Sequence, residues 1–455
     1  MNIFKEKQLE NKANTYNCDF KKLKLKDIKD FYKTNSTDLT LGVEYERISL
    51  DKNTLKTAPV YKVQKIVEQM AYSLDWTILY DDNVVIGAFD EIGNSISLEP
   101  ACQLEISLKP YKNIEDIEKK LFELVDLSNQ IAKIYDVVFL STGVNPIDDI
   151  EDIELLNKKR YLIMDKYLPY SQNGELSQKM MRKTAGIQVN IDYFDNSDLY
   201  YKLKLLNQIS PYIMGLSANS VFENNSLSGY KSTRAHIWHY TDNDRCNYFY
   251  NDIFDGLNNF KTRFDVVSSY VEKILEIPII YIVRDNKIIP FNGKVNFSEF
   301  MKNGYMGYYA TLNDYILHQS LCFPDIRVKK YIEIRNHDSA ETKYAIAYCA
   351  LYKGLFLQDS KKTLNIFKFL NNSSNFQNSK LIAKYGLDVF VDKKHTGWDV
   401  VEMLLNIAQF NLQANEREYL QPLIKLSQNK KTQADLILEK NITLPSEQFR
   451  QNTYY

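Results

Sequence analysis

The stretch of sequence that decides the fold runs Gly42-Val43-Glu44-Tyr45-Glu46-Arg47-Ile48. Apolar or aromatic residues alternate here with charged ones, and successive side chains of a β-strand point to opposite faces of the sheet. Glu44 and Glu46 therefore project from one face, while Val43 and Tyr45 project from the other. The alternation predicts a strand that carries two carboxylates on one side and core residues on the other.

Two more stretches follow the same alternation. In residues 97–107 (SLEPACQLEIS) it places Glu105 on a polar face that is opposed by leucine and isoleucine. In residues 331–335 (YIEIR) it places Glu333 and Arg335 on one face, with two isoleucines on the other. Three predicted strands thus each present an acid on a polar face.

An antiparallel sheet with one solvated face is the ordinary explanation of such alternation. Solvated faces usually mix Lys, Thr and Ser with acids, whereas these strands would cluster carboxylates if they are neighbours. Clustered carboxylates repel one another unless a cation lies among them. Magnesium takes oxygen ligands, usually one or two carboxylates plus phosphate oxygens and water. The pattern therefore favours two or more magnesium ions bound with a nucleotide, and Arg335 beside Glu333 suits a phosphate contact.

Composition and charge exclude several other classes of protein. The chain has 455 residues, is 44% hydrophobic and carries a formal net charge of -1, so no global field would attract nucleic acid or an anionic membrane. No apolar stretch resembles a signal peptide or approaches the length of a membrane span, and we expect a cytoplasmic protein. The five cysteines form no C-x-x-C pair, which is typical of free thiols in a reducing compartment.

The periodicity of the rest of the chain indicates the α+β class, a sheet backed by helices. The runs that we expect to be strands are residues 39–50, 95–108, 136–142, 185–193, 277–283 and 330–336. Asn113 suits the N-cap of an amphipathic helix. No clear domain boundary is present, so we expect one domain, 1–455, with an N-terminal extension at 1–35 and a helical C-terminal segment at 396–455.

Other chemistries are disfavoured. A serine hydrolase lacks support because no G-x-S-x-G stretch occurs. A P-loop is absent, since Gly293-Lys294 is followed by Val295, and no G-x-G-x-x-G stretch occurs either. His236 and Trp238 lie on an expected strand, and such residues are more often packed core than catalytic groups.

Six motifs stand in a consistent order between about Leu41 and Lys440. They are GVEYE (42–46), SLEPACQLEIS (97–107), RYLIMDKYLP (160–169), MMRKTAGIQVNIDY (180–193), ANSVFENNSLSGYKSTRAHIWHYTDNDR (218–245) and YIEIRNHD (331–338). With these motifs the chain resembles the glutamate-cysteine ligases (gamma-glutamylcysteine synthetases) of the plant and proteobacterial type. These belong to the glutamate-amine ligases, which have a glutamine-synthetase-like fold.

The resemblance implies a mainly antiparallel, curved sheet that encloses the active site of a single catalytic ligase domain. It implies an enzyme that uses ATP and Mg²⁺ to phosphorylate the gamma-carboxylate of L-glutamate. The amine of L-cysteine would then displace phosphate, which gives gamma-glutamylcysteine and ADP in the first step of glutathione biosynthesis. The implied partners are these small molecules, without nucleic acid or membrane, and the sequence does not indicate an oligomeric state.

The resemblance also assigns roles residue by residue. Magnesium is assigned to the acids of three motifs, namely Glu44, Glu46, Glu105 and Glu333. Catalysis is assigned to Arg234 and Arg335, substrate binding to Arg234 and Thr184, and nucleotide binding to Gln188, Glu99 and Arg335.

Several positions depart from the family pattern. Ala101 and Cys102 stand where plant-type members carry Gly-Gly, so we expect an altered local pocket. Asp165 and Lys166 follow RYLIM, and Lys183 replaces a common arginine, so we expect changed charge matching to the substrate. Two other functions stay open: a related ligase with another amine or amino acid as acceptor, and a non-catalytic relative that binds nucleotide or amino acid.

Overall fold

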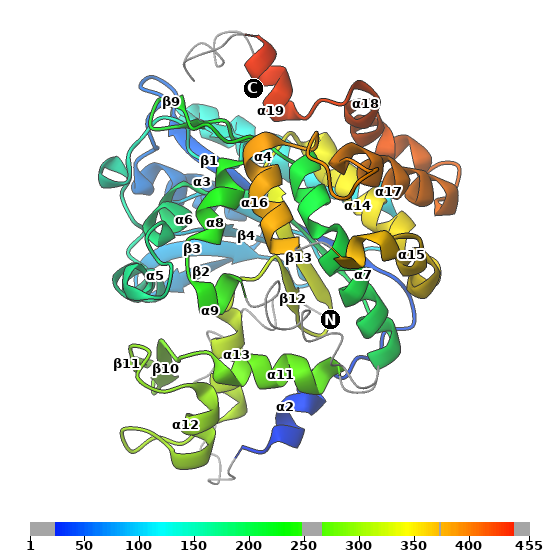
Figure 1. Cartoon of the computed structure of the whole chain (residues 1–455). Helices are drawn as coiled ribbons and strands as arrows, with labels where there is room; N and C mark the ends of the chain where they lie inside the picture. The colour runs from blue at the N-terminus through cyan, green and yellow to red at the C-terminus, as the bar shows by residue number, and fades with distance from the viewer. Residues whose placement is uncertain (1–22, 248–265, 373–374, 441–455) are drawn as a thin grey trace.

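One long strand, β1 (Leu41–Asp51), lies at the centre of the sheet in the computed structural model (Figure 1). The structure describes residues 23–247, 266–372 and 375–440. β1 pairs antiparallel with β5 on one side, with β7 on the other, and with β6 at its end. The nine strands follow the order β12-β13-β7-β1-β5-β4-β3-β2, with β6 beside β1, and every pair is antiparallel.

The other elements are the remaining strands of this sheet, two separate hairpins and the helices. Its other strands are β2 (Thr77–Asp81), β3 (Val84–Phe89), β4 (Ser95–Leu98), β5 (Leu104–Ser107), β6 (Val137–Leu140), β7 (Gly186–Ile191), β12 (Ile326–Val328) and β13 (Ile332–Asp338). Two separate hairpins pair β8 (Phe222–Glu223) with β9 (Ser226–Leu227) and β10 (Tyr281–Arg284) with β11 (Lys287–Pro290). The helices up to residue 303 are α2 (Leu25–Phe31), α3 (Val60–Leu74), α4 (Ile114–Ile134), α5 (Lys159–Tyr167), α6 (Ser177–Lys183), α7 (Asn196–Leu216), α8 (Thr233–His239), α9 (Asn243–Cys246), α11 (Val266–Glu276) and α12 (Phe297–Asn303). Those that follow are α13 (Leu312–Ser320), α14 (Thr342–Phe356), α15 (Ser360–Ile366), α16 (Asn375–Tyr385), α17 (Gly397–Asn411), α18 (Gln421–Asn429) and α19 (Gln433–Glu439).

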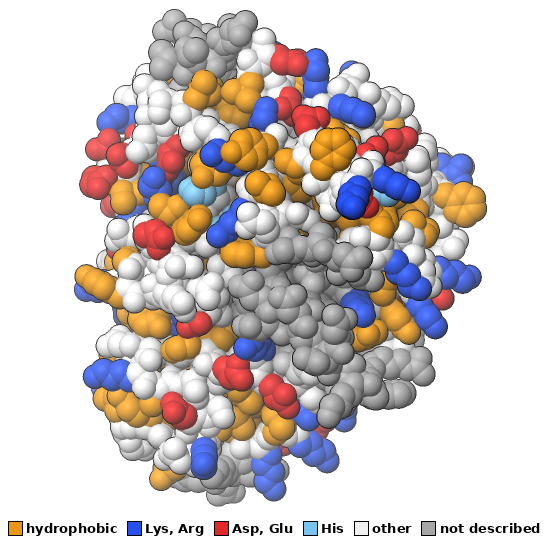
Figure 2. Space-filling model, in the orientation of Figure 1, with side chains coloured by type: hydrophobic (Ala, Val, Ile, Leu, Met, Phe, Trp, Pro, Cys, Tyr) orange, Lys and Arg blue, Asp and Glu red, His pale blue; other side chains and the backbone are white. Residues whose placement is uncertain are grey.

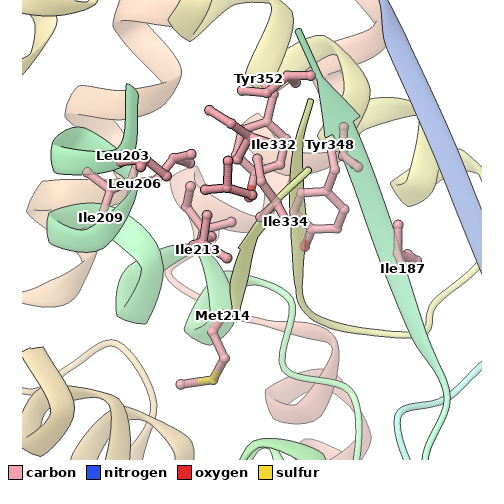
Figure 3. Packing of buried hydrophobic residues seen from close by; sticks show 14 of the residues in the cluster. Ile187, Leu203, Leu206, Ile209, Ile213, Met214, Ile332, Ile334, Tyr348 and Tyr352 are labelled. Carbon is pink, nitrogen blue, oxygen red and sulfur yellow. The ribbon is translucent and has the colours of Figure 1, made fainter. Parts of the chain in front are cut away.

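The core lies between one face of the sheet and the helices α4, α7 and α14. Ile187 of β7 and Ile332 and Ile334 of β13 point toward α7 and α14 (Figure 3). Val43 and Tyr45 of β1 belong to the same buried cluster. Full burial of one such side chain contributes about 1.5–3 kcal/mol, so this layer holds the strands in place. The opposite face of these strands carries the polar side chains.

The expected α+β class, the antiparallel sheet and the helical C-terminal segment are confirmed. The strands expected at 39–50, 136–142, 185–193 and 330–336 correspond to β1, β6, β7 and β13. The helix expected after Asn113 is α4, whose buried positions repeat at helical spacing from Ile114 to Ile131. The division into a single domain with terminal extensions stays a prediction; the described part of 1–35 packs α2 against α11 and α13.

Two expected strands differ from the structure. Residues 95–108 form two strands, β4 and β5, because the chain turns back at Glu99, whose carbonyl accepts from the Cys102 N–H at 2.8 Å. Cys102 has the left-handed φ of 60°, which closes this turn. Only the end of the run 277–283 is a strand, β10, and it pairs in a separate hairpin with β11.

The strand expected at His236 and Trp238 is wrong. These residues lie on the helix α8, which begins after Ser232, whose side chain accepts from the Ala235 N–H. A serine N-cap satisfies a free backbone donor and so favours a helix here. His239 is buried, and burial lowers its pKa to about 3, whereas His236 and Trp238 are partly buried. The expectation that this stretch is packed rather than catalytic stays a prediction.

The surface and the cysteines carry few unusual features. Figure 2 shows charged side chains of both signs interspersed with hydrophobic ones, in keeping with the net charge of -1. Within the described ranges, no helix is both long and apolar enough to cross a membrane.

The four described cysteines are free and buried, and burial raises the pKa of each thiol. Cys18 lies outside the described residues.

The contact between α14 and α17 provides a test of the packing. A Cβ on Gly354 would lie 2.5 Å from the carbonyl oxygen of Ala408, which is backbone and cannot rotate away. Gly354→Ala should therefore lower the free energy of unfolding by about 1–3 kcal/mol, despite the better helix propensity of alanine. Urea denaturation measures this change. Asn406→Ala, on the exposed side of α17, is the matched control and should leave stability nearly unchanged; equal stability of both variants would contradict the close helix contact.

Candidate active site

A cavity of about 450 Å³ opens over the polar face of the sheet. Its walls come from β1, β4, β5, β7, β12, β13, the helices α5 and α6, and the β10–β11 hairpin. Of the nine residues to which the sequence assigns a role, eight line it: Glu44, Glu46, Glu99, Glu105, Thr184, Gln188, Glu333 and Arg335. The predicted site residues therefore meet in one place, although they come from strands far apart in the sequence.

Strand register brings the acids of β1 and β5 together. Glu46 lies directly opposite Glu105, and Glu44 lies opposite Ser107 on β5 and Gln188 on β7. The hydroxyl of Ser107 donates to Glu105 at 2.9 Å, and that of Ser97 on β4 does so at 2.6 Å. The carboxylates of Glu44, Glu46 and Glu105 therefore lie at the floor of the cavity rather than in bulk water.

Glu46 is the acid most affected by its neighbours. It accepts from the Gly186 N–H at 2.6 Å and from the Gln188 side-chain amide at 3.1 Å. Burial, together with the negative charges of Glu99 and Glu105, raises the pKa of Glu46 to about 8. This end of the cavity therefore has an excess of negative charge, which a bound cation would relieve.

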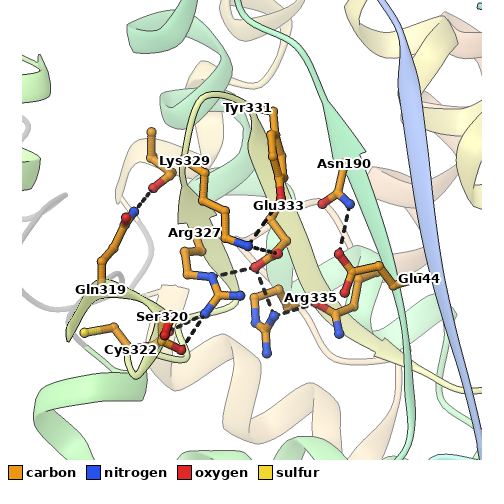
Figure 4. A network of polar contacts seen from close by, with 12 residues as sticks. Glu44, Asn190, Gln319, Ser320, Cys322, Arg327, Lys329, Tyr331, Glu333 and Arg335 are labelled. Atoms are coloured by element: carbon orange, nitrogen blue, oxygen red, sulfur yellow. Dashed lines mark hydrogen bonds and ion pairs between the residues drawn. The ribbon is translucent and has the colours of Figure 1, made fainter. Parts of the chain in front are cut away.

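The opposite end of the cavity is basic (Figure 4). Glu333 forms ion pairs with Arg327 at 2.6 Å, Arg335 at 2.9 Å and Lys329 at 3.1 Å. Burial alone would raise the pKa of Glu333, but these three cations hold it well below its usual value. Arg335 also donates to the side-chain oxygen of Gln188 at 2.5 Å, which links the basic end to the strands of the acidic end.

Arg234 is the one predicted residue that does not line the main cavity. It lies in α8, and a Cβ on Gly186, which shares the polar face of β7 with Gln188, would approach its guanidinium to 2.5 Å. Its Nη2 donates to the carbonyl oxygen of Arg335 at 3.0 Å, while its Nε is buried without a hydrogen bond. With Arg335 it lines a smaller adjoining cavity. Arg234 therefore holds the backbone of Arg335 and lies close enough to Glu46 to lower its pKa, against the larger effects that raise it.

Asp338 explains why α8 occupies this position. It lies at the end of β13 and accepts from the hydroxyls of Ser220 at 2.6 Å and Ser232 at 2.8 Å, and from the Asn219 N–H at 2.8 Å. Ser232 is also the N-cap of α8, so the start of the helix that carries Arg234 is tied to the sheet.

Thr184 and Gln103 join the sheet to α6 beside the cavity. The Thr184 hydroxyl donates to the Met180 carbonyl at 2.7 Å, and the Gln103 amide donates to the Thr184 carbonyl at 3.0 Å. Thr184 is buried but still lines the cavity. Its hydroxyl keeps an acceptor position for a ligand, since its own hydrogen is used.

The acids can supply only part of the coordination shell of a magnesium ion. In the described part of the chain, no three Asp, Glu, His or Cys side chains are grouped to hold an ion by themselves. Glu46 and Glu105 are nevertheless directly opposite each other, with Glu44 next along β1. This suits a magnesium ion that takes one or two carboxylates and completes its shell with phosphate oxygens and water. Glu333 fits this role less directly, because three cations already contact it.

The expected change in the pocket at the departures from the family pattern stays a prediction. None of the five departing residues lines the cavity. Cys102 packs in the core, and Asp165 forms an ion pair with Arg182 of α6. Lys183 is fully buried and donates to the side-chain oxygen of Asn224. Asp165 and Lys183 therefore join elements of the fold, and any effect on the substrate would be indirect.

Sequence reasoning missed several basic residues of the site. Among them are Arg327 and Lys329 of the segment that forms β12 and its turn, and Lys158, Lys159 and Arg160 at the start of α5. The signal was available, because Arg327-Val328-Lys329 follows the same alternation as the three acidic strands. It also missed the cavity's apolar wall, which includes Met180, Trp238 and Phe323, since burial around a ligand site leaves no local pattern.

The fold and the site define a class of enzyme. A crystal structure of glutamate-cysteine ligase from Francisella tularensis, in complex with AMP, aligns over 90% of this chain and 86% of its own. Its TM-score is 0.52 at 14% sequence identity, so the likeness shows that the chain has the glutamate-cysteine ligase fold.

Sequence comparison gives the family. The model of glutamate-cysteine ligase family 2 matches residues 40–451, and the chain therefore belongs to this family. The chloroplastic glutamate-cysteine ligase B of Oryza sativa is 28% identical over 382 residues, which are 82% of this chain and 74% of that protein. The chloroplastic enzyme of Nicotiana tabacum is 30% identical over 70% of this chain and 59% of its own length. The expected family and enzyme class are confirmed, while a cytoplasmic location stays a prediction.

The raised pKa of Glu46 predicts how the stability of the metal-free protein depends on pH. Since the folded state holds this proton up to about pH 8 and the usual pKa is 4.5, folding takes up a proton between these values. The free energy of unfolding should therefore fall as pH rises through this range, by up to about 1.4 kcal/mol per pH unit. Glu46→Gln removes this contribution and should flatten the dependence.

Chemical denaturation at pH 5, 6, 7 and 8, in the presence of a chelator, measures this pH dependence of the free energy of unfolding. Glu91→Gln, in the exposed turn between β3 and β4, is the matched control and should keep the wild-type slope. Equal slopes for Glu46→Gln and wild type would show that Glu46 is already ionised at neutral pH.

Proposed function

We propose that this chain ligates the gamma-carboxylate of L-glutamate to the amine of L-cysteine at the expense of ATP, through a gamma-glutamyl phosphate. One observation carries the proposal: in a member of glutamate-cysteine ligase family 2, buried carboxylates and a basic cluster face each other across one cavity. Such a cavity suits a reaction that must hold anionic substrates together with a divalent cation.

Magnesium would be held at the acidic end by Glu44, Glu46 and Glu105, where the excess of negative charge favours it. When bound, it would neutralise charge on the phosphate oxygens. Glu333 is the fourth proposed ligand and, with Arg335, would meet the phosphates from the basic end. No nucleophile of the enzyme is needed, because the carboxylate of glutamate attacks the terminal phosphoryl group and the amine then attacks the resulting acyl phosphate.

Positioning falls to the residues around this centre. Gln188 bridges Glu46 and Arg335 through its amide nitrogen and oxygen, so it would align the two ends of the cavity around the nucleotide. Arg234 supports Arg335 and would stabilise substrate carboxylate or phosphate from its place beside Gly186. Thr184 and Glu99 also line the cavity, where Thr184 would contact glutamate and Glu99 the nucleotide or its metal.

The nucleotide and the acceptor have separate support. The Francisella tularensis ligase with this fold was determined in complex with AMP, which favours a nucleotide in the cavity. Cysteine as acceptor is supported by the names of the curated relatives and suits the apolar wall at Met180, Trp238 and Phe323, which can pack against a thiol.

Incubation of the purified protein with Mg²⁺, ATP, glutamate and cysteine should yield ADP and gamma-glutamylcysteine. Mass spectrometry over a panel of acceptor amines measures the product and ranks the acceptors. Cysteine should give the highest kcat/KM. A better rate with another amine would replace cysteine as the acceptor, and the absence of any product with every amine would reject the ligase function.

Replacing the acids should abolish turnover while the protein stays folded. Glu44→Gln and Glu333→Gln should each lower kcat by about 100–1000-fold or more, because each would remove charge next to the transferring phosphate. A coupled ADP assay measures the rate, with melting temperature as the check on folding. Glu91→Gln again serves as the control and should retain the wild-type rate. Full activity in both acid variants would remove these residues from the site.

A further inference from the structure

The basic end of the cavity contains a lysine that neither the sequence motifs nor the comparisons assign. Lys329 directly follows β12, and it alternates with Val328, whose side chain lies in the core. Lys329 therefore faces the cavity together with Arg327, Glu333 and Arg335. Three positive side chains surround the single negative charge of Glu333, so this end of the cavity attracts anions.

The two basic residues of this segment are held very differently. Arg327 is buried, and its guanidinium donates to Glu333 and to the backbone carbonyls of Ser320 at 3.1 Å and Cys322 at 3.0 Å. These carbonyls belong to the end of α13 and the loop after it, so Arg327 is fixed by the protein itself. Arg327 is a positioning residue for Glu333 and has little freedom to approach a ligand.

Lys329 is held by fewer and weaker contacts. Its Nζ lies 3.1 Å from one oxygen of Glu333 and donates to the hydroxyl of Tyr331 at 3.2 Å. The side chain is 16% exposed and lies in the cavity wall (Figure 4). A lysine ammonium carries three donors on a flexible stem, so Lys329 can turn from Glu333 to an incoming anion without loss of core contacts.

We propose that Lys329 is a further phosphate-binding residue, which contacts the phosphates of the nucleotide during the reaction. The proposal rests on the proposed function and deepens it. The phosphates of a nucleotide carry several negative charges, whereas the carboxylate of Glu333 carries one. Lysine binds phosphate as a point charge. Lys329 and Arg335 contact the same carboxylate, so a phosphate group that displaces Lys329 from Glu333 stays within reach of Arg335. The acidic end, with Glu44, Glu46 and Glu105, is left for the cations that accompany the nucleotide.

The test compares three variants with the wild-type protein. Lys329→Met removes the charge, Lys329→Arg keeps it, and Lys330→Met removes the neighbouring charge, which lies over the ring of Phe31 outside the cavity. Calorimetric titration with a non-hydrolysable ATP analogue and Mg²⁺ measures nucleotide binding. Steady-state kinetics give KM separately for ATP and for glutamate, and melting temperatures show that each variant is folded.

Lys329→Met should weaken binding of the analogue by about 10–100-fold and raise KM for ATP accordingly, with KM for glutamate unchanged. Lys329→Arg should restore most of the affinity, and Lys330→Met should bind as wild type does. Should Lys329→Met be unfolded, Lys329→Gln keeps a polar head group and is titrated in its place.

Two results would overturn the proposal: wild-type affinity for the analogue in the charge-removing variant, or a rise in KM for glutamate alone, which would make Lys329 a carboxylate contact. The outcomes separate the two proposals. If the wild-type protein makes no gamma-glutamyl product but Lys329→Met loses affinity for the nucleotide, the proposed function is rejected. The contact between Lys329 and the phosphates is then still supported. If product forms and Lys329→Met binds the nucleotide normally, only the proposed role of Lys329 is rejected.

Discussion

The antiparallel pairing of β1 with β5 and β7 is the constraint on which the site depends. It places Glu46 directly opposite Glu105, and Glu44 opposite Gln188. Like charges on neighbouring strands repel one another, and in water the side chains would separate. Here they stay together because the alternate residues of the same strands are packed between the sheet and α4, α7 and α14. Turning the acids outward would expose that core, which costs more than the repulsion.

The same sheet separates charge along the cavity. Carboxylates gather over β1 and β5, and basic side chains gather around Glu333 over β12 and β13. Lys158, Lys159 and Arg160 at the start of α5 line a further part of the wall. Glu46, without a direct cation contact, has its pKa raised to about 8, whereas Glu333 among three cations has its pKa lowered. A metal–nucleotide complex carries both signs of charge, so a cavity with one acidic and one basic end can orient it as well as bind it.

A second set of residues at the end of β7 and β13 holds the reactive face in place. Asp338 ties the start of α8 to β13, and α8 places Arg234 against Gly186 and the Arg335 backbone. Because Gly186 has no side chain, the guanidinium can approach the strand that also donates its N–H to Glu46. A change at this buried contact would therefore reach both ends of the cavity.

The sequence by itself determined which side chains of the central strands face the cavity. Alternation in 42–48 and 331–335 is a local property of an extended chain, so it predicted the acids at Glu44, Glu46 and Glu333 and the central strands of the fold. The same rule applied to Arg327 and Lys329 would have predicted the basic end as well. The turn at Glu99 and the helix at His236 depend on short-range hydrogen bonds that alternation does not detect. Only the tertiary structure decided the place of Arg234 beside Gly186 and Arg335, and the burial of Cys102 and Lys183 away from the cavity. These depend on contacts between segments far apart in the chain, and local periodicity carries no information about register, depth or which partner a buried side chain meets.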